Sequence, residues 1–271
     1  MTLKSVPRQV LLFAITLTAL APLTFMLITS VKRPEDYAAN PLGLPSSPTL
    51  SNYVTALVDV PTLRWALNSL VVTVVAVVIS SSIAALAAYA IAFGRFRGRS
   101  VVLSSAIAFI MVPPVVLLLP MFVVMVSLHL VNRLWSVMLF YSCLLVPFAL
   151  FFLVNFFRSV PRELIEASVV DGAGPLRTLW SVVLPISRPA LATITVVNAV
   201  WAWNELLVAL VFLQDESQRT LMAGLTLLQG RYVTNQPLVL AVAVLSILPV
   251  AVFYLLTQRS FVRGLTAGMG K

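Results

Sequence analysis

The sequence predicts an all-α protein, a polytopic transmembrane bundle of six helices. Of its 271 residues, 60% are hydrophobic and only 10% are charged, and the mean hydropathy is +1.02. These values exclude an ordinary soluble domain. A helical span needs about 20 apolar residues, and six stretches reach this length without the alternation typical of a membrane β-barrel. They are residues 10–30, 68–93, 101–128, 135–157, 191–213 and 238–256.

The first stretch predicts a retained helix. Lys4 and Arg8 precede it, and residues 19–21 (Ala-Leu-Ala) resemble the cleavage site of a signal peptide. The apolar run continues past this site to Ile28, which is long enough to cross a membrane. Cleavage would leave five spans and would place the termini on opposite sides, which the distribution of charge does not favour.

Prolines interrupt three of the later stretches. Pro113, Pro114 and Pro120 fall in the third, Pro147 in the fourth and Pro249 in the sixth. Each removes a backbone hydrogen bond and bends its helix. The bends are either static curvature satisfied by neighbouring helices or hinges of a mobile bundle, and the sequence leaves both interpretations open.

The basic residues predict that both termini are cytoplasmic, because cytoplasmic loops carry the excess of Lys and Arg. With the N-terminus inside, twelve of the 18 basic residues lie inside: Lys4, Arg8, Arg95, Arg97, Arg99, Arg158, Arg162, Arg177, Arg188, Arg259, Arg263 and Lys271. The other six lie outside: Lys32, Arg33, Arg64, Arg133, Arg219 and Arg231. The net charge of +9 therefore reflects topology. Nucleic-acid binding is not predicted, because the chain has no soluble domain with a basic stripe.

A polar loop at about residues 159–189, between the fourth and fifth stretches, predicts a helix-turn-helix elbow. Pro161 suits a helix start. Gly172 can adopt the positive φ that ends this helix, Pro175 suits the start of a second one, and Pro185 should stop it.

The second helix of this elbow carries an apolar stripe. Leu176, Leu179, Trp180 and Val183 recur at helical spacing. The stripe either enters a groove on a partner or packs on the protein's own bundle, and spacing alone does not decide between them.

The loop resembles the cytoplasmic docking loop of ABC importer permeases. That family's pattern is Glu-Ala-Ala, three residues, Gly, nine residues, an aliphatic residue, any residue and Leu-Pro. Ser168 replaces the second Ala, and Val182 stands where Ile is usual. The matching positions are Glu166, Ala167, Gly172, Val182, Leu184 and Pro185.

Further segments resemble the carbohydrate branch of these permeases, in particular the shorter six-span subunit of maltose-type transporters. They are residues 30–34 (Ser-Val-Lys-Arg-Pro), 68–70 (Asn-Ser-Leu), 88–90 (Ala-Tyr-Ala), 95–98 (Arg-Phe-Arg-Gly), 203–205 (Trp-Asn-Glu), 258–259 (Gln-Arg) and 261–268. The chain departs from relatives in its short tail, Met269-Gly270-Lys271.

The resemblance implies one permease domain, residues 1–271, in a binding-protein-dependent importer of a sugar or related carbohydrate. The expected location is a bacterial or archaeal cytoplasmic (inner) membrane, which the chain crosses several times. The implied partners are membrane lipid, a second permease that is a different chain, two nucleotide-binding ATPase subunits and an extracytoplasmic solute-binding protein.

The resemblance also implies which residues dock the ATPase. Closure of the ATPase pair would move the elbow as a rigid body and rock the fourth and fifth spans. Glu166 and Asp171 are the expected charged contacts, and Gly172 is the turn between them and the second helix. The docking residues are Glu166, Ala167, Ser168, Asp171, Gly172, Ala173, Leu184 and Pro185.

The chain is not expected to be an enzyme or to hold a cofactor. A phosphate-binding loop needs Gly-Lys five residues after its first glycine, and the segment from Gly264 to Lys271 lacks that spacing. ATP and Mg are therefore expected on the partner ATPase. One cysteine, Cys143, and one histidine, His129, provide no disulfide framework, metal site or catalytic group.

The fifth stretch contains the candidate pathway or gate residues Asn198, Trp201, Asn204 and Glu205. A charge within a span costs about 2.5–3.5 kcal/mol on insertion scales, so Glu205 should avoid lipid. Asn198, Trp201 and Glu205 would share one helix face, with Asn204 near its edge. That face either lines a sugar path or makes packing or gate contacts. The alternative function is an ion-coupled secondary transporter that uses Glu205.

Overall fold

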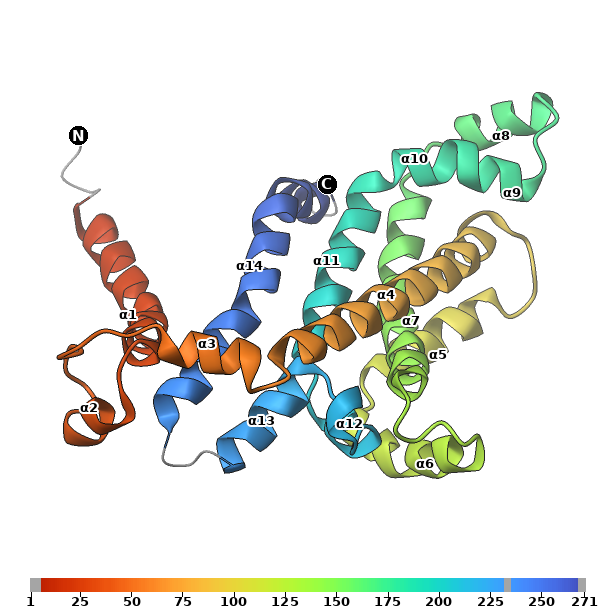
Figure 1. Cartoon of the computed structure of the whole chain (residues 1–271). Helices are drawn as coiled ribbons and strands as arrows, with labels where there is room; N and C mark the ends of the chain where they lie inside the picture. Colours follow the sequence, from red (N-terminus) through yellow and green to blue (C-terminus); the bar gives the residue numbers. More distant parts are fainter. Residues whose placement is uncertain (1–5, 232–234, 268–271) are drawn as a thin grey trace. The chain divides into compact units, whose positions relative to one another are not determined.

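The computed structural model describes residues 6–231 and 235–267, which form helices, turns and loops and no strand (Figure 1). The tail 269–271, where the sequence departs from its relatives, lies outside the described residues. The helices are α1 (Val6–Ser30), α2 (Pro34–Ala39), α3 (Ser51–Val58), α4 (Thr62–Phe93), α5 (Arg99–Ile110), α6 (Pro114–Ser127), α7 (Leu134–Arg158), α8 (Arg162–Val170), α9 (Pro175–Thr178), the π-helical turn η2 (Leu179–Val183), α10 (Leu184–Ile186), α11 (Arg188–Asn204), α12 (Leu207–Phe212), the 3₁₀ turn η3 (Glu216–Gln218), α13 (Leu221–Arg231) and α14 (Gln236–Ala267).

Four of the six predicted stretches are single helices that are long and apolar enough to cross a membrane. The qualifying segments are Gln9–Ser30, Thr62–Phe93, Leu134–Arg158 and Gln236–Gln258. The helical class is therefore confirmed, and the described residues provide four spans, or up to six if each of two bent helix pairs counts as one.

The third stretch is not one straight helix, because α5 and α6 are bent by 102°. Pro113 has an extended backbone, with φ −61° and ψ 132°, and Pro114 occupies the first turn of α6. A residue before proline is displaced from the helical region, and proline provides no N–H for the preceding helix. The two adjacent prolines therefore end one helix and start another, whereas Pro120 lies inside α6.

The fifth stretch is also interrupted, and the prediction of one helix over 191–213 is wrong. Its main helix, α11, starts at Arg188 and ends at Asn204. Glu205 then has an extended backbone, with φ −68° and ψ 128°, and α12 begins at Leu207. At its other end, α11 meets the segment Pro175–Ile186 at a bend of 80°.

The chain forms two compact units, one from residues 1–66 and 221–249 and the other from residues 67–220 and 250–271. In the first unit, Lys32 is fully buried and its Nζ donates to the carbonyl oxygens of Asn40 and Pro41 at 2.9 and 3.0 Å. The Asn52 amide donates to the carbonyl oxygens of Ser30 and Lys32 at 2.8 and 2.7 Å. These bonds fix the chain where it leaves α1.

The core of the second unit is built from small and large apolar residues of α4, α7, η2 and α11. Ala84, Ala88 and Ala92 recur every four residues on α4 and are buried. In membranes, small residues at this spacing let helix backbones approach closely, and the resulting dispersion contacts stabilise the pair. Leu153, Phe157 and related large side chains fill the space around them.

Candidate functional site

The first arm of the elbow and its turn have the predicted geometry. Helix α8 begins at Arg162, directly after Pro161, and ends at Val170. Gly172 has a φ of +77°. Its N–H donates to the Val169 carbonyl at 3.0 Å, and the Ala173 N–H donates to the Ser168 carbonyl at 2.9 Å. This is a Schellman ending, which requires the left-handed conformation that glycine adopts readily.

The second arm differs from the prediction, because Pro185 does not stop it. Helix α9 continues through η2 into α10, which ends at Ile186. The Leu184 N–H donates to the Leu179 carbonyl, five residues back. The widened turn lies directly before the proline and belongs to the π class, which inserts one extra residue into a helix. The change of direction comes at Ser187, two residues later than predicted.

The apolar stripe of this arm is divided between a buried pair and an exposed pair. Leu179 and Val183 are 1% and 0% exposed and belong to the unit's own core. Leu176 and Trp180 are 63% and 68% exposed. The arm therefore anchors itself through one pair and presents the other pair outward.

The predicted docking residues gather on this two-armed projection (Figure 1). Glu166, Ala167, Asp171, Gly172 and Pro185 are exposed. Ala173 and Leu184 are partly buried, and Ser168 is buried. Within the described residues neither the Glu166 nor the Asp171 carboxylate forms an ion pair, so both acids remain open to a partner.

A hydroxyl network that the sequence did not predict joins the two arms. Ser168 Oγ donates to the Ile165 carbonyl at 2.8 Å and lies 2.9 Å from Thr178 Oγ1. The Tyr89 side chain of α4 lies close to Thr178. Ser168 and Thr178 are buried, where the bond is shielded from competing water. The network therefore links the docking arms to a candidate span.

Glu205 does not share a continuous helix face with Asn198 and Trp201, because α11 ends before it. Its Oε2 accepts the Tyr141 hydroxyl at 2.5 Å, and its carboxylate accepts the N–H groups of Val208 at 3.1 Å and Ala209 at 3.4 Å. Side-chain oxygens satisfy unpaired N–H groups at helix starts in this way. The carboxylate caps α12 and ties it to α7.

The other three candidates in this stretch have different environments. The Trp201 ring meets the Tyr141 ring edge-on, with 5.4 Å between centroids. Asn198 is 1% exposed and its Nδ2 has no hydrogen-bond partner among the described residues. Asn204 is exposed, and its Nδ2 donates to the Val200 carbonyl at 2.8 Å. The structure thus brings together Trp201, Tyr141 and Glu205, and directs Asn204 elsewhere.

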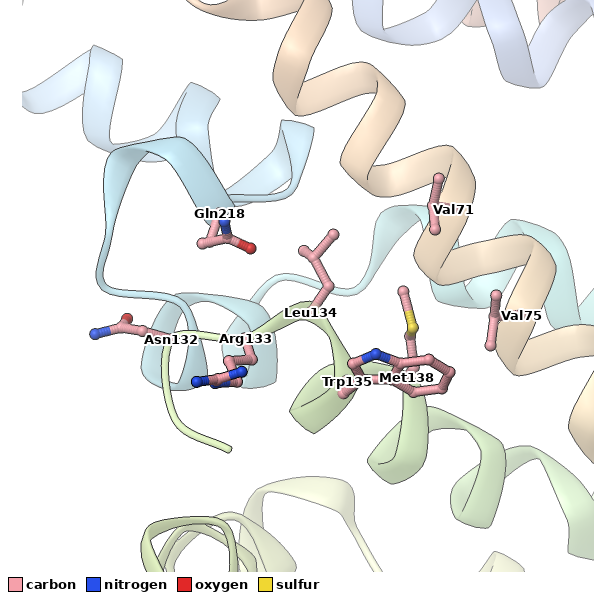
Figure 2. A pocket seen from close by; sticks show the side chains of 8 residues that line it. All are labelled: Val71, Val75, Asn132, Arg133, Leu134, Trp135, Met138 and Gln218. Carbon is pink, nitrogen blue, oxygen red and sulfur yellow. The ribbon is translucent and has the colours of Figure 1, made fainter. Parts of the chain in front are cut away.

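A second feature is a pocket of about 630 Å³ at the start of α7 (Figure 2). Val71 and Val75 of α4 and Trp135 and Met138 of α7 contribute apolar groups, and Asn132, Arg133 and Gln218 contribute polar ones. No site residue was predicted here, because the lining comes from segments far apart in sequence. Leu134 completes the lining.

Two asparagines hold the loop beside this pocket. Asn132 has a positive φ of 60°, and its Oδ1 accepts the N–H groups of Gln214 and Asp215 at 2.6 and 3.1 Å. The Asn68 amide donates to the carbonyl oxygens of Ser217 and Arg219 at 3.0 and 2.9 Å. Asn68 belongs to the Asn-Ser-Leu segment noted in the sequence. In the structure its side chain holds the loop at Ser217 and Arg219.

Residues 80–265, which include both arms of the elbow, match the family described as "Binding-protein-dependent transport system inner membrane component". The chain belongs to this family. Its members are inner-membrane components by description, and the long apolar helices of this chain agree with a membrane location.

Permeases of named transport systems are similar to this chain over almost its whole length. It is 36% identical over 250 residues to the sulfoquinovosyl glycerol transport system permease of Agrobacterium fabrum, covering 92% of this chain and 88% of that one. It is 33% identical over 253 residues to the trehalose/maltose transport system permease of Thermococcus litoralis, covering 92% and 90%.

A solved structure extends the likeness to the fold. A chain of a bacterial ABC transporter involved in import of the acidic polysaccharide alginate superposes with a TM-score of 0.80 at 29% identity. The match covers 95% of this permease and 96% of that chain. The predicted resemblance to carbohydrate ABC importer permeases is therefore confirmed.

Proposed function

We propose that this chain is the transmembrane permease of an ATP-driven ABC importer for a sugar or related carbohydrate. It is a transport subunit and not an enzyme, and ATP hydrolysis belongs to a separate subunit. The observation that carries the proposal is the two-armed elbow within the family match, with Glu166 and Asp171 unpaired and with Leu176 and Trp180 exposed. An exposed apolar pair beside free carboxylates suits a groove with basic edges on a partner.

In this proposal, the residues from 159 to 189 of a single permease domain dock one of two ATPase subunits, which bind ATP and Mg. Ser168, Ala173, Leu184 and Pro185 shape the docking surface that Glu166, Ala167, Asp171 and Gly172 present. ATPase closure would move the arms together, since Ser168 and Thr178 connect them. The motion would reach α11 through Ser187 and α4 through Tyr89.

The assembled importer would contain a second, different permease chain and an extracytoplasmic solute-binding protein. Each bent helix pair would count as one span, which gives six spans in the lipid of a bacterial or archaeal inner membrane with both termini in the cytoplasm. The basic residues support this orientation.

We also propose that Asn198, Trp201, Asn204 and Glu205 belong to the pathway or gate, with Glu205 in a gate. Three hydrogen-bond donors already occupy the Glu205 carboxylate. An ion-coupled secondary transporter is therefore not favoured, because its coupling carboxylate must exchange ions during each cycle.

Substitution of Gly172 tests the docking assignment. No atom lies within 4 Å of a Cβ built on Gly172, so a substitution acts through the positive φ alone. Gly172→Val should cost about 1–2 kcal/mol or more in backbone strain, displace the second arm and abolish co-purification of the ATPase. Gly172→Asn is the matched control, because Asn tolerates this conformation, and it should retain the ATPase.

Two results would contradict the proposal. Equal ATPase retention by both variants would remove the elbow as the docking site. Solute uptake by the isolated chain in vesicles would instead indicate a secondary carrier.

A further inference from the structure

A small pocket in the second unit gathers three arginines from three helices. Its volume is about 240 Å³. It lies where α4 and α7 end and where α5 and α8 begin. The lining residues are Ile91, Ala92, Phe93, Arg99, Arg158, Val160 and Arg162.

The three guanidinium groups have no carboxylate partner within the described ranges 6–231 and 235–267. Arg99 Nη1 donates to the Gly94 carbonyl at 3.3 Å, and no described residue accepts a hydrogen bond from the guanidinium of Arg158 or Arg162. Like charges around one pocket repel one another, and an anion between them would reverse that interaction. Guanidinium groups also match the paired oxygens of a phosphate.

The backbone around the pocket does not oppose an anion strongly. The ends of α4 and α7 would present carbonyl oxygens, but the Gly94 N–H donates to Ala90 O at 2.9 Å and the Val160 N–H donates to Phe157 O at 3.1 Å. The starts of α5 and α8 contribute the positive ends of two helices. These positive ends offset the negative ends of α4 and α7, so the three guanidinium groups determine the sign of the local field.

We propose that this arginine pocket binds the phosphate of an anionic phospholipid headgroup. The pocket lies at the ends of two membrane-length helices, Thr62–Phe93 and Leu134–Arg158, the depth at which headgroups lie. Phe93 adds partly exposed apolar surface beside the arginines, which suits the glycerol region of a lipid, whereas Ile91 and Val160 are buried. Basic pockets between spans bind anionic headgroups in this way. Assignment to the cytoplasmic leaflet rests on the orientation given under Proposed function.

A lipid in this pocket would act directly on the docking arm. Arg162 is the first residue of α8, and Arg158 is the last residue of α7. A phosphate held by both would brace the short connection between span and arm. Free phosphate could provide the same oxyanion, so the test must separate the two sources.

Native mass spectrometry of the purified full-length chain within its importer tests the proposal. The protein is exchanged into detergent with equal amounts of phosphatidylglycerol and phosphatidylcholine. The wild type should retain phosphatidylglycerol selectively, and the double variant Arg99→Gln/Arg158→Gln should lose at least fivefold of it. Arg97→Gln is the matched control, because Arg97 is exposed in the same loop region but does not line the pocket, and it should bind like the wild type.

Equal phosphatidylglycerol retention by the double variant and the Arg97→Gln control would overturn the proposal. Complete displacement of the lipid by millimolar inorganic phosphate would also overturn it and assign the pocket to free phosphate. Arg158→Gln alone should lose part of the lipid, which keeps the test usable if the double variant fails to fold. Lipids are counted on the permease chain after it is released from the complex in the mass spectrometer. Loss of the ATPase, which would contradict the proposed function, is therefore recorded separately.

Discussion

The Glu205 side chain joins two helices. The start of α12 has N–H groups without partners in the helix, and the carboxylate accepts those of Val208 and Ala209. The Tyr141 hydroxyl completes the arrangement from α7. The carboxylate is thus stabilised by the helix start that it caps.

Glu205→Ala should lower the free energy of unfolding by about 1–3 kcal/mol, because it leaves the Tyr141 hydroxyl and the α12 N–H groups unsatisfied. Glu205→Gln should lose less and retain sugar uptake, since its amide oxygen still accepts N–H groups. Denaturation in mixed micelles and uptake by the reconstituted importer measure both effects. Asp215→Ala, at an exposed acid, is the control and should change neither. Unchanged stability of Glu205→Gln together with abolished uptake would favour a coupling role instead.

At the scale of elements, the elbow is a pair of helical arms joined by a buried hydrogen bond between Ser168 and Thr178. Ser168 replaces the alanine of the common docking pattern, and its hydroxyl reaches Thr178 on the other arm. The same residue's carbonyl accepts the Ala173 N–H that closes the Schellman turn. One position therefore fixes both the turn and the packing of the arms.

Ser168→Ala and Thr178→Val should interact in a double-mutant cycle. A net hydrogen bond contributes about 0.5–1.5 kcal/mol, and each single change leaves the other hydroxyl without this partner. The coupling energy should lie in this range when unfolding is followed in mixed micelles. Ser181→Ala is the control, because the Ser181 hydroxyl bonds only within its own arm, to the Arg177 carbonyl at 2.6 Å. A coupling energy of zero would show that the arms are held by other contacts.

Hydropathy and the positions of proline and glycine predicted much of this elbow, but not where its second arm ends. Pro161, Gly172 and Pro175 mark the turns correctly, because their backbone limits act locally. The arm continues beyond Pro185 because a wide turn precedes it, and no residue type specifies such a turn. The division of the stripe into buried Leu179 and exposed Trp180 depends on α11 and α4, so it could not be read from the arm alone.

At the scale of the whole molecule, the long helices were predictable and the bends were only partly so. Apolar length identifies α4 and α7 directly. The pair Pro113-Pro114 predicted the break between α5 and α6, and Pro185 predicted the 80° bend to within two residues. No residue predicted the break at Glu205 between α11 and α12. Contacts such as Tyr141 with Glu205 join residues 64 positions apart, and a single sequence carries no local signal of them.

Exposed apolar side chains continue along the candidate spans, as on α1, where Val10, Phe13 and Leu17 are at least 60% exposed. Such surfaces suit contact with lipid or with other apolar helices. The chain is therefore built to be stable in a membrane assembly.

Cysteine labelling should establish the orientation. In a Cys143→Ala background, Arg97→Cys should react with a membrane-impermeant maleimide only after the cells are permeabilised. Asp215→Cys should react in intact cells, since it lies in an exposed loop on the predicted outer side. The reverse pattern would invert the topology. Labelling of both in intact cells would contradict the odd number of crossings predicted between them.

The π-helical turn at Leu179–Val183 affects how the number of residues in the docking arm sets the direction that its side chains face. Successive residues of an α-helix are about 100° apart, and this turn inserts one extra residue. Because the wide turn absorbs that residue, its deletion would restore regular winding and leave Leu176 facing the same way relative to α11. A deletion in the regular part of the arm, between Pro175 and Thr178, would instead rotate the residues before it by about that angle. Homologous permeases should therefore vary in sequence in this regular part but keep its residue count, because a change in length there would turn the docking face away from its partner.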